Sequence, residues 1–545
     1  MQPELVAKIR EVNLRAVAGW APVQIKFGTS GWRSLQAETK NQALKTGESK
    51  SFTAENVQLV TQAIADHLKA EYQAAELARG LIVSHGTRED GNQFARPAAA
   101  VLAANGIKVL LVLGYTPTPV SSFTIQHQQA LAGIHITASH NPYNSVRRDN
   151  GLKFTPAHGG PAPVETTTDL EERIKEKMQS GPIFKTIDYA LAKAAGLIVE
   201  EDVLPAYQTY LRSLIDFVAI KKSAKKVFVD AMHGSSARCL AEILAAEDVA
   251  WQVFRPAPLH EVVATLPADY RPEPDEDHLP ELIAAVKAAG GKGFGIANDE
   301  DADRGGQVDA RGNFITPNQA GGIYLWYLYK YKQVPAERLK AGVAKTVVTT
   351  NLINALAAKI NIPLYETPVG FKHFVQYPQT VLKLEESAHF SGLDWQSWDD
   401  GILEGLSLLQ IEVETGKSLA KILAEAEKFV GRKFIYGRNN YSEQEGLTPA
   451  LKEQLGAELK LAKEEQAAGI APAAMTMTKK LKEFTELAVA KVITLDGMKL
   501  LFTDGSWLAF RSSGTEPVVR TYAEASTKAA QKSLAKLGKK LLGIN

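Results

Sequence analysis

The sequence predicts an α/β protein with several domains, and three observations support this prediction. Short β-branched runs, such as residues 81–83, lead into a polar or glycine-rich loop and then into an alanine- and leucine-rich stretch, which is typical of βαβ units and mainly parallel sheets. A chain of 545 residues is too long for one hydrophobic core, and about 150 residues per domain gives three to four domains. Near the C-terminus, two strand-like runs joined by Asp504-Gly505 indicate a hairpin. We therefore expect three similar α/β domains with mixed, mainly parallel sheets, and a smaller C-terminal α+β domain.

The expected elements follow one another in a regular order. After the strand at 81–83, a helix over 94–105 ends at Gly106. Further strands of the same pattern are expected at 107–113, 227–229 and 295–297, and residues 346–350 begin another unit. Polar turns and changes of texture divide the chain into domains over 1–200, 201–310, 311–430 and 431–545.

Composition excludes several classes of protein. The chain has 62 basic and 61 acidic residues, without the basic surplus that a nucleic-acid-binding protein would show. No apolar run approaches the 18 or so residues of a membrane span, and the N-terminal residues do not resemble a cleaved signal. The single cysteine, Cys239, cannot form an intrachain disulfide. We expect a cytoplasmic protein that binds neither nucleic acid nor membranes.

Asp299, Asp301 and Asp303 alternate in the segment NDEDADRGG, directly after an apolar strand. Open α/β sheets bind ligands at the carboxyl ends of their strands, and grouped carboxylates favour a hard cation such as Mg²⁺ or Ca²⁺. An EF-hand is excluded because Arg304 and Ala310 stand where its loop needs glycine and glutamate. A solvated acidic loop is the alternative interpretation, but the adjacent Arg304 favours an anionic ligand shared with a metal.

Two segments contain side chains suited to phosphate. In residues 137–142, Ser139 lies beside a histidine after an apolar run, as a nucleophile or a phosphate carrier would. Residues 511–517, with Arg520 just beyond them, combine hydroxyls, a glycine and two arginines in the manner of an anion cradle. Considered alone, residues 511–517 fit an ordinary turn equally well, and residues 137–142 fit a turn better than a reactive site.

A further segment offers partners for a sugar. Glu385 and Ser387 could bind sugar hydroxyls and His389 could move protons, with Lys372 a short distance upstream. Buried structural polar residues or an exposed helix edge are the alternatives. Nucleotide motifs are incomplete, because Ile411 and Ile296 stand where the Walker A and GxGxxG patterns require glycine. ATP and NAD are therefore not expected as cofactors.

Taken in order, five motifs resemble those of the α-D-phosphohexomutase family, most of all its phosphoglucomutase/phosphomannomutase members. The motifs are FGTSGWR, TASHNP, DEDADR, EES and RSSGTEPVVRTYAEA, and their spacing covers almost the whole chain. The resemblance implies four domains around a central cleft, each contributing one loop. It also implies an intramolecular phosphotransferase that binds one Mg²⁺ per active site.

The resemblance assigns roles to individual residues. Ser139 is the implied phosphoserine and, with the three aspartates, a ligand of Mg²⁺, while Lys153 matches the active-site lysine of the family. His389 matches a histidine that some members have. Arg33 and Arg304 would contact the transferring phosphoryl group, and Glu385 and Ser387 would contact the sugar. The other phosphate would be bound by Arg511, Ser513, Gly514, Thr515 and Arg520. Gly86 stands where an aspartate is usual before Thr-Arg, and we expect that position to be structural.

The expected activity is that of a phosphoglucomutase, with glucose 1,6-bisphosphate as intermediate and activator. Lys153 and His389 are the candidates for the base that deprotonates the sugar hydroxyl, and His140 is a third. The alternatives are a phosphomannomutase or dual-specificity mutase, a hexosamine-phosphate mutase, a glucose 1,6-bisphosphate synthase, a non-catalytic sugar-phosphate sensor and a metal-dependent serine hydrolase. A hexose phosphate is the expected partner, and we expect a monomer or weak dimer.

Overall fold

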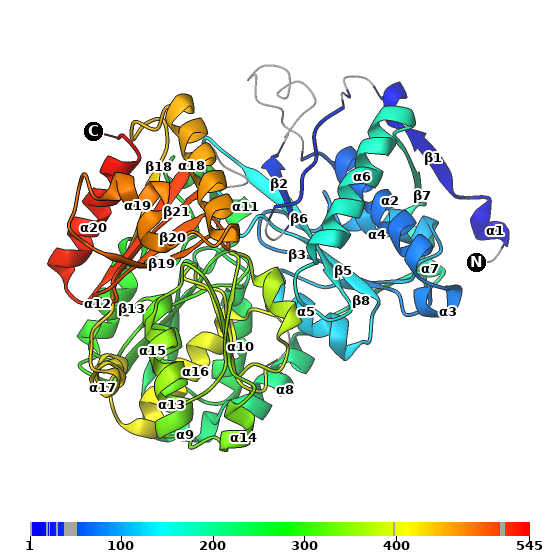
Figure 1. Ribbon diagram of the computed structural model, residues 1–545. Coiled ribbons are helices and arrows are strands. Elements are labelled where there is room, and N and C mark those ends of the chain that lie inside the picture. Colours follow the sequence, from blue (N-terminus) through cyan, green and yellow to red (C-terminus); the bar gives the residue numbers. More distant parts are fainter. Residues whose placement is uncertain are drawn as a thin grey trace. The chain divides into compact units, whose positions relative to one another are not determined.

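The computed structural model describes residues 3–17, 20, 22–28, 31–36, 52–395, 398–512 and 518–544. The chain forms two compact units (Figure 1). Unit 1 contains Met1–Thr316 and Ala388–Ser418, and unit 2 contains Pro317–Ser387 and Leu419–Asn545. The chain therefore leaves unit 1, returns to it for one segment, and leaves it again.

The first domain of unit 1 is built on a six-stranded mixed sheet of order β2-β6-β5-β3-β4-β8. Its strands are β2 (Trp32–Leu35), β3 (Leu81–His85), β4 (Val109–Val112), β5 (Ala132–Ile136), β6 (Asp149–Pro156) and β8 (Ile198–Glu201). The four strands β5, β3, β4 and β8 are parallel, whereas β6 runs antiparallel to β5 and to β2. A separate antiparallel pair joins β1 (Arg10–Asn13) to β7 (Ile183–Thr186).

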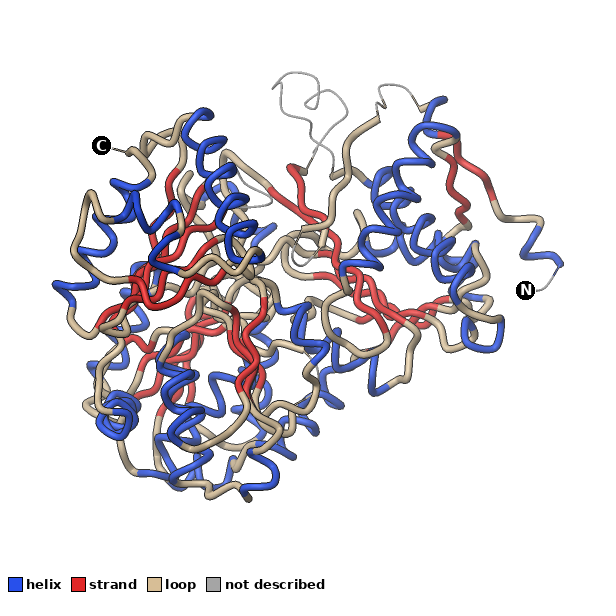
Figure 2. Tube along the Cα trace, viewed as in Figure 1, coloured by secondary structure: helices blue, strands red, loops and turns tan. Residues whose placement is uncertain are grey.

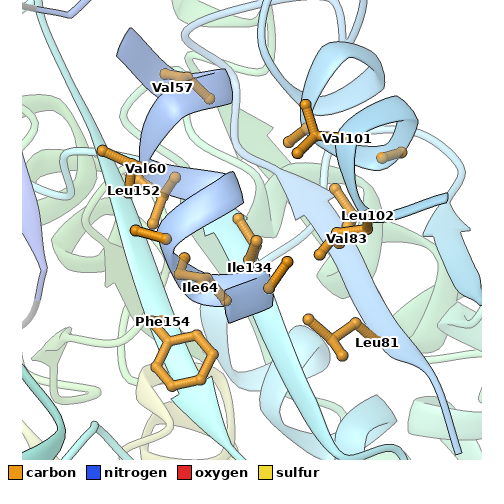
Figure 3. Close-up of a cluster of buried hydrophobic side chains, with 14 of the residues drawn as sticks. Val57, Val60, Ile64, Leu81, Val83, Val101, Leu102, Ile134, Leu152 and Phe154 are labelled. Atoms are coloured by element: carbon orange, nitrogen blue, oxygen red, sulfur yellow. The ribbon is translucent and has the colours of Figure 1, made fainter. Parts of the chain in front are cut away.

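Helices cover both faces of this sheet (Figure 2). They are α2 (Ala54–Glu71), α4 (Ala95–Ala104), α5 (Thr118–His127) and α6 (Val164–Ser180), with the short α1 (Pro3–Val6), η1 (Leu14–Ala16), α3 (Ala74–Leu77) and α7 (Tyr189–Ala194) nearby in the sequence. Because side chains alternate along a strand, Leu81 and Val83 point to the core shared with α2 and α4 (Figure 3). Gly133, the partner of Ile82 on β5, instead faces Ile125 of α5, which a Cβ at Gly133 would approach to 2.6 Å.

The second domain of unit 1 has a five-stranded sheet of order β10-β9-β11-β12-β13. The strands are β9 (Lys226–Asp230), β10 (Trp251–Phe254), β11 (Gly293–Asn298), β12 (Gly305–Val308) and β13 (Phe314–Ile315). The helices are α8 (Leu204–Leu214), α9 (Phe217–Lys222), α10 (Ser236–Ala246), α11 (Leu259–Val262), α12 (Pro280–Ala288) and, from the returning segment, α16 (Gly401–Thr415), with 3₁₀ turns η2 (Val263–Thr265) and η3 (Glu276–His278). Leu282 and Val286 of α12 pack beside Gly295, while Gly405 of α16 packs on Ile296. The two helices therefore cover opposite faces of β11.

Unit 2 begins with a parallel sheet in which β14 lies between β15 and β16. These strands are β14 (Val343–Thr346), β15 (Leu364–Thr367) and β16 (Leu382–Leu384); the helices are α13 (Pro317–Lys330), α14 (Ala336–Leu339), α15 (Leu352–Lys359), η4 (Phe371–Gln376) and α17 (Leu419–Val430). The expected strand at 346–350 is placed too late, because β14 ends at Thr346. The next residues turn, with Thr346 Oγ1 and Thr349 Oγ1 2.7 Å apart and Lys345 Nζ donating to the Thr349 carbonyl at 2.9 Å.

The C-terminal part of unit 2 is an antiparallel sheet of order β18-β22-β21-β20-β19. The strands are β18 (Ile435–Tyr441), β19 (Val489–Ile493), β20 (Met498–Phe502), β21 (Trp507–Ser512) and β22 (Val519–Ala525), and the helices are α18 (Pro449–Ala467), η5 (Pro472–Ala474), α19 (Thr476–Leu481) and α20 (Lys528–Leu541). The expected hairpin is present, since β20 and β21 pair antiparallel around Asp504-Gly505. The predicted fold class, with three α/β domains and a C-terminal domain that carries an antiparallel sheet, is confirmed. Within the described part of the chain, we find no helix long and apolar enough to cross a membrane.

Candidate active site

Ser139 lies in the loop that follows β5, inside unit 1. Its side chain is fully buried, and its Oγ donates to Asp299 Oδ2 at 2.7 Å and lies 3.2 Å from His140 Nδ1. Its backbone is left-handed, with φ +52°, a conformation that a residue with a side chain rarely adopts. Ser139 N donates to Thr137 Oγ1 at 2.9 Å. The fold thus fixes a single hydroxyl against the first of the three aspartates.

Asp299, Asp301 and Asp303 meet in the loop after β11, and one carboxylate oxygen of each lies within 4.8 Å of the others. All three side chains are buried. Burial and the nearby charges of Asp303 and Asp301 raise the pKa of Asp299 well above its ordinary value. Within the described residues, Asp301 Oδ1 and Asp303 Oδ1 have no hydrogen-bond partner. A buried carboxylate oxygen without a partner is costly, and these two would be satisfied by a cation, so the cluster could hold a metal.

Lys153 reaches the same cluster from β6. Its Nζ lies 2.7 Å from Asp301 Oδ2 and 2.6 Å from Asp303 Oδ2, and it also donates to Thr118 Oγ1 at 3.1 Å. Burial alone would lower the pKa of Lys153, but the two carboxylates outweigh it and raise that pKa. Lys153 is therefore held as a cation against the loop that carries Asp299, the partner of Ser139.

Two arginines lie beside the cluster. Arg33, on β2, donates from Nη1 to Asn141 Oδ1 at 2.9 Å, next to the loop of Ser139. Burial, and then the like charge of Arg304, lower the pKa of Arg33. Arg304 N donates to Asp299 Oδ1 at 3.2 Å, and its Nε lies 3.9 Å from Asp303 Oδ1. The two like charges repel each other, and an anion such as a phosphoryl group would offset that repulsion.

His389 belongs to the segment that returns to unit 1, and its backbone forms an antiparallel bridge with Arg304. Its Nδ1 makes a very short contact with Asp399 Oδ2 and lies 3.8 Å from Asp303 Oδ1. Burial lowers the pKa of His389, but Asp303 and Asp399 outweigh that effect and raise it. An imidazole whose Nδ1 is held by a carboxylate is oriented for proton transfer through its other nitrogen.

The predicted sugar-binding residues lie in unit 2. Glu385 is buried directly after β16, and its Oε1 accepts from the backbone N–H of Gly370 at 2.6 Å. Ser387 and Lys372 are half-buried. Gly370 has a φ of +125°, which favours glycine, so the backbone that binds Glu385 is shaped by the residue type at 370.

The predicted phosphate cradle lies at the end of the β21–β22 hairpin. Arg511 and Arg520 are directly opposite each other in the register of these strands. Arg511 Nε donates to Asp496 Oδ2 at 2.8 Å, and the same oxygen accepts from Val369 N at 3.0 Å. Asp496 therefore connects Arg511 to Val369, the residue before the Gly370 that binds Glu385. Ser513, Gly514 and Thr515 lie outside the described residues.

The fold thus brings eight of the predicted residues together in unit 1: Arg33, Ser139, Lys153, Asp299, Asp301, Asp303, Arg304 and His389. Thr118, Asp399 and Asp496 also bond directly to predicted site residues, although the sequence analysis did not single them out. Thr118 donates to Asp301 Oδ2 at 2.8 Å. Each of the three meets its partner only through the tertiary fold, so no local pattern assigns it to the site. The paired acids Asp399-Asp400 before a helix are a visible signal, but they do not indicate a contact with His389.

Models of the phosphoglucomutase/phosphomannomutase family match four segments of the chain. The alpha/beta/alpha domain I model matches residues 24–181, domain II matches 205–312, domain III matches 316–429, and the C-terminal domain matches 472–537. Together these matches cover most of the chain, in the order that the family has.

Known proteins are similar over nearly the whole length. A phosphoglucomutase of Komagataeibacter xylinus is 29% identical, covering 94% of this chain and 89% of that protein. Human phosphoglucomutase-1 is 28% identical, covering 90% of this chain and 88% of that protein. The crystal structure of a putative phosphomannomutase from Thermus thermophilus has a TM-score of 0.71 at 26% identity, covering 96% of this chain and all of the other.

Proposed function

We propose that this chain, which belongs to the phosphoglucomutase/phosphomannomutase family of the α-D-phosphohexomutases, interconverts glucose 1-phosphate and glucose 6-phosphate. The chain is a phosphohexomutase, an intramolecular phosphotransferase that binds hexose phosphates. The identity of the sugar and the roles of individual residues form the proposal. The observation that carries it is the 2.7 Å contact between Ser139 Oγ and Asp299, beside the three buried aspartates.

In the proposed reaction, phosphorylated Ser139 transfers its phosphoryl group to the 6-hydroxyl of glucose 1-phosphate. The bond from phosphorus to Ser139 Oγ breaks, a bond to the sugar O6 forms, and a base takes the hydroxyl proton. The resulting glucose 1,6-bisphosphate turns over and returns its 1-phosphoryl group to Ser139, and a proton is delivered to O1. Glucose 6-phosphate is released, and glucose 1,6-bisphosphate also serves as the activator that phosphorylates the enzyme.

Side chains of unit 1 provide the charge that this transfer needs. Phosphoserine carries a charge of about −1.5 to −2 at pH 7, and phosphoryl transfer depends mainly on positioning and electrostatic stabilisation. Arg33, Arg304 and Lys153 are proposed to bind the transferring group. Lys153, His389 and His140 were the expected candidates for the base. Because two carboxylates hold Lys153 as a cation, the proposal assigns the base to His389 or to His140, whose Nδ1 lies 3.2 Å from Ser139 Oγ.

Mg²⁺ is the metal proposed for Asp299, Asp301 and Asp303, with a phosphoserine oxygen as a further ligand. The ligand atoms that the three aspartates offer are all oxygens, and two of these oxygens have no hydrogen-bond partner within the described chain, which fits a hard cation. When bound, the ion would offset negative charge on the phosphoryl group. The protein's own contribution is to hold the three carboxylates and Ser139 in one buried site.

Residues of unit 2 are proposed to hold the rest of the substrate. Lys372, Glu385 and Ser387 would bind the sugar. Arg511, Ser513, Gly514, Thr515 and Arg520 would bind the phosphate that does not react. Because the two sugar phosphates exchange places between the half-reactions, this cradle must accept either end of the sugar.

Glucose is favoured over mannose by sequence around the site. The EES run is more like that of glucose and mannose members than that of amino-sugar members, and the TPAHGGPA stretch after Lys153 favours glucose. The two relatives described above are named phosphoglucomutases. The proposal includes domain boundaries near residues 200, 310 and 430, a cytoplasmic location and a monomer or weak dimer. The lone and buried Cys239 suits a reducing compartment.

A coupled assay tests the proposal. Purified protein is assayed with glucose 1-phosphate, mannose 1-phosphate and glucosamine 1-phosphate, with and without glucose 1,6-bisphosphate. Glucose 1-phosphate should give the highest kcat/KM, and a preference for mannose or glucosamine phosphate would refute the glucose assignment. Ser139→Ala should lose about 10³-fold or more of kcat, whereas Ser145→Ala, an exposed serine in the same loop, should keep it. Normal turnover by Ser139→Ala would refute the carrier role.

A further inference from the structure

Arg88 is a buried cation close to the site that has no role in the proposed transfer. It lies in the loop after β3, and only 1% of it is exposed. A guanidinium that is removed from water must be surrounded by acceptors to be tolerated. Arg88 meets this requirement with four acceptors, which belong to two different loops of the site.

Three backbone carbonyls accept hydrogen bonds from Arg88. Its Nη2 donates to the carbonyls of Ser139 at 2.5 Å and Asn141 at 2.9 Å, and its Nη1 donates to the carbonyl of Asp149 at 2.6 Å. The first two carbonyls flank the turn in which Ser139 has its left-handed backbone. One rigid, planar group therefore fixes both ends of that turn, which a flexible ammonium could not do equally well.

The fourth acceptor of Arg88 belongs to the aspartate loop. Arg88 Nε donates to Glu300 Oε2 at 3.0 Å, and both side chains are fully buried. Glu300 stands between Asp299 and Asp301 in the sequence. Its Oε1 accepts from Thr87 N at 2.6 Å, and its Oε2 also accepts from Thr137 Oγ1 at 2.8 Å.

This arrangement also explains Gly86. A Cβ at this position would lie 2.1 Å from Glu300 Oε1, far inside contact distance, so any larger residue would displace the Glu300 carboxylate. The aspartate that is usual at this position in the family cannot be accommodated with Glu300 where it is. The structural role expected for Gly86 thus has a physical cause, which is space for Glu300.

We propose that Arg88 and Glu300 are positioning residues that lock the loop of Ser139 to the loop of the three aspartates. Through Arg88, the carbonyls around Ser139 are tied to the carboxylate that sits between two of the proposed metal ligands. The pair therefore sets the distance between the Ser139 hydroxyl and the metal site. This inference rests on the proposed role of Ser139 as phosphate carrier.

The test uses Arg88→Lys and the nearly isosteric Glu300→Gln in the full-length protein. Arg88→Lys keeps the charge but cannot reach four acceptors in one plane, and Glu300→Gln weakens the pair while keeping its shape. A displacement of about 1 Å in an active site can lower the rate about 10²-fold. We expect kcat with glucose 1-phosphate to fall about 10²-fold in Arg88→Lys and by less in Glu300→Gln, with KM changing less than about threefold.

Arg255→Lys is the matched control. Arg255 also pairs with an acidic side chain, donating to Asp230 at 2.8 and 2.6 Å, and within the described residues none of its hydrogen bonds reaches the loop of Ser139. It should lower the melting temperature as Arg88→Lys does, yet retain kcat. Two further readouts are the rate at which glucose 1,6-bisphosphate phosphorylates the enzyme, followed by intact mass, and the affinity for Mg²⁺ in calorimetric titration.

The results separate the two proposals. Slow phosphorylation and low kcat in Arg88→Lys and Glu300→Gln, but not in Arg255→Lys, would support the positioning role. If Ser139→Ala is inactive while both variants of the pair keep the kcat of the control, the positioning role is refuted and the proposed function stands. If Ser139→Ala is active, the proposed function fails first. Should Arg88→Lys fail to fold, Glu300→Gln alone decides, by its kcat relative to Arg255→Lys.

Discussion

Replacing Asp400 with asparagine should stabilise the protein above pH 7 and change its stability little near pH 4. Asp400 is fully buried and caps α16: its Oδ1 accepts from Leu403 N at 2.9 Å, and its Oδ2 accepts from Tyr207 Oη at 2.6 Å. Burial raises the pKa of Asp400 to about 7, although these two hydrogen bonds lower it in part. Asparagine has the shape of the protonated carboxyl and remains a good helix cap.

The sign and size of the effect follow from linkage between protonation and folding. Between the ordinary pKa of 3.8 and the folded value of about 7, the folded state binds more protons than the unfolded state, so stability falls as pH rises. At about 1.4 kcal/mol for each pKa unit, the ionised carboxylate costs about 4 kcal/mol above pH 7, and none of this below pH 4. For a unit of this size, 4 kcal/mol corresponds to roughly 5 °C in melting temperature.

Thermal unfolding of wild type and Asp400→Asn at pH 4.5, 6 and 8 measures this difference. The gain in melting temperature should grow with pH and level off above pH 7, and kcat should stay within about twofold because Asp399 is retained. The control is Asp216→Asn at the exposed cap of α9, where the side chain also accepts a backbone N–H, from Ala219 at 2.9 Å. If Asp400→Asn were less stable than wild type at pH 8, or if its gain did not depend on pH, the reasoning would be wrong.

Three further predictions concern activity. Asp301→Asn removes one proposed ligand and should weaken Mg²⁺ binding in calorimetric titration and lower kcat at least about 10²-fold; unchanged Mg²⁺ affinity would contradict the metal assignment. Arg511→Gln removes one arginine–phosphate contact and should raise the KM for glucose 1-phosphate about 10- to 100-fold, whereas a loss confined to kcat would exclude a binding role. Asp399→Asn weakens the contact that orients His389 and should lower kcat about 10²-fold at constant KM. The control is Asp394→Asn, on an exposed residue of the same segment, which should have no effect. Equal kcat in the two variants would show that the contact of Asp399 is not needed.

Much of the fold could be predicted because its strands are short apolar runs with clear ends. Residues 81–83 and 227–229 lie inside β3 and β9, since each run is followed by glycine or polar residues that stop it. The strand expected at 346–350 was placed too late, and the reason lies in the tertiary structure. Val347 and Val348 are β-branched, but they turn away from β14 and pack against Trp507 of the C-terminal sheet, which the local pattern cannot reveal.

The candidate site also contains some residues that could be predicted from the sequence and others that could not. Ser139 and the three aspartates lie at the ends of recognisable strands, so their loops could be found in the sequence. Asp399 could not, because its contact with His389 depends on α16 packing against β11 and β12. A periodic pattern shows that a helix has an apolar face, but it does not show which sheet that face will cover.

The path of the chain between the two units limits how the protein can be dissected. Ala388–Ser418 packs in unit 1 although it follows 71 residues of unit 2, so a fragment that stops at Thr316 would lack His389 and one of the two helices that cover β11. A chimera designed to change sugar preference should instead exchange Pro317–Ser387 between two fixed splice points. Such a graft would keep the recipient's own Ser139, three aspartates and His389, which all belong to unit 1.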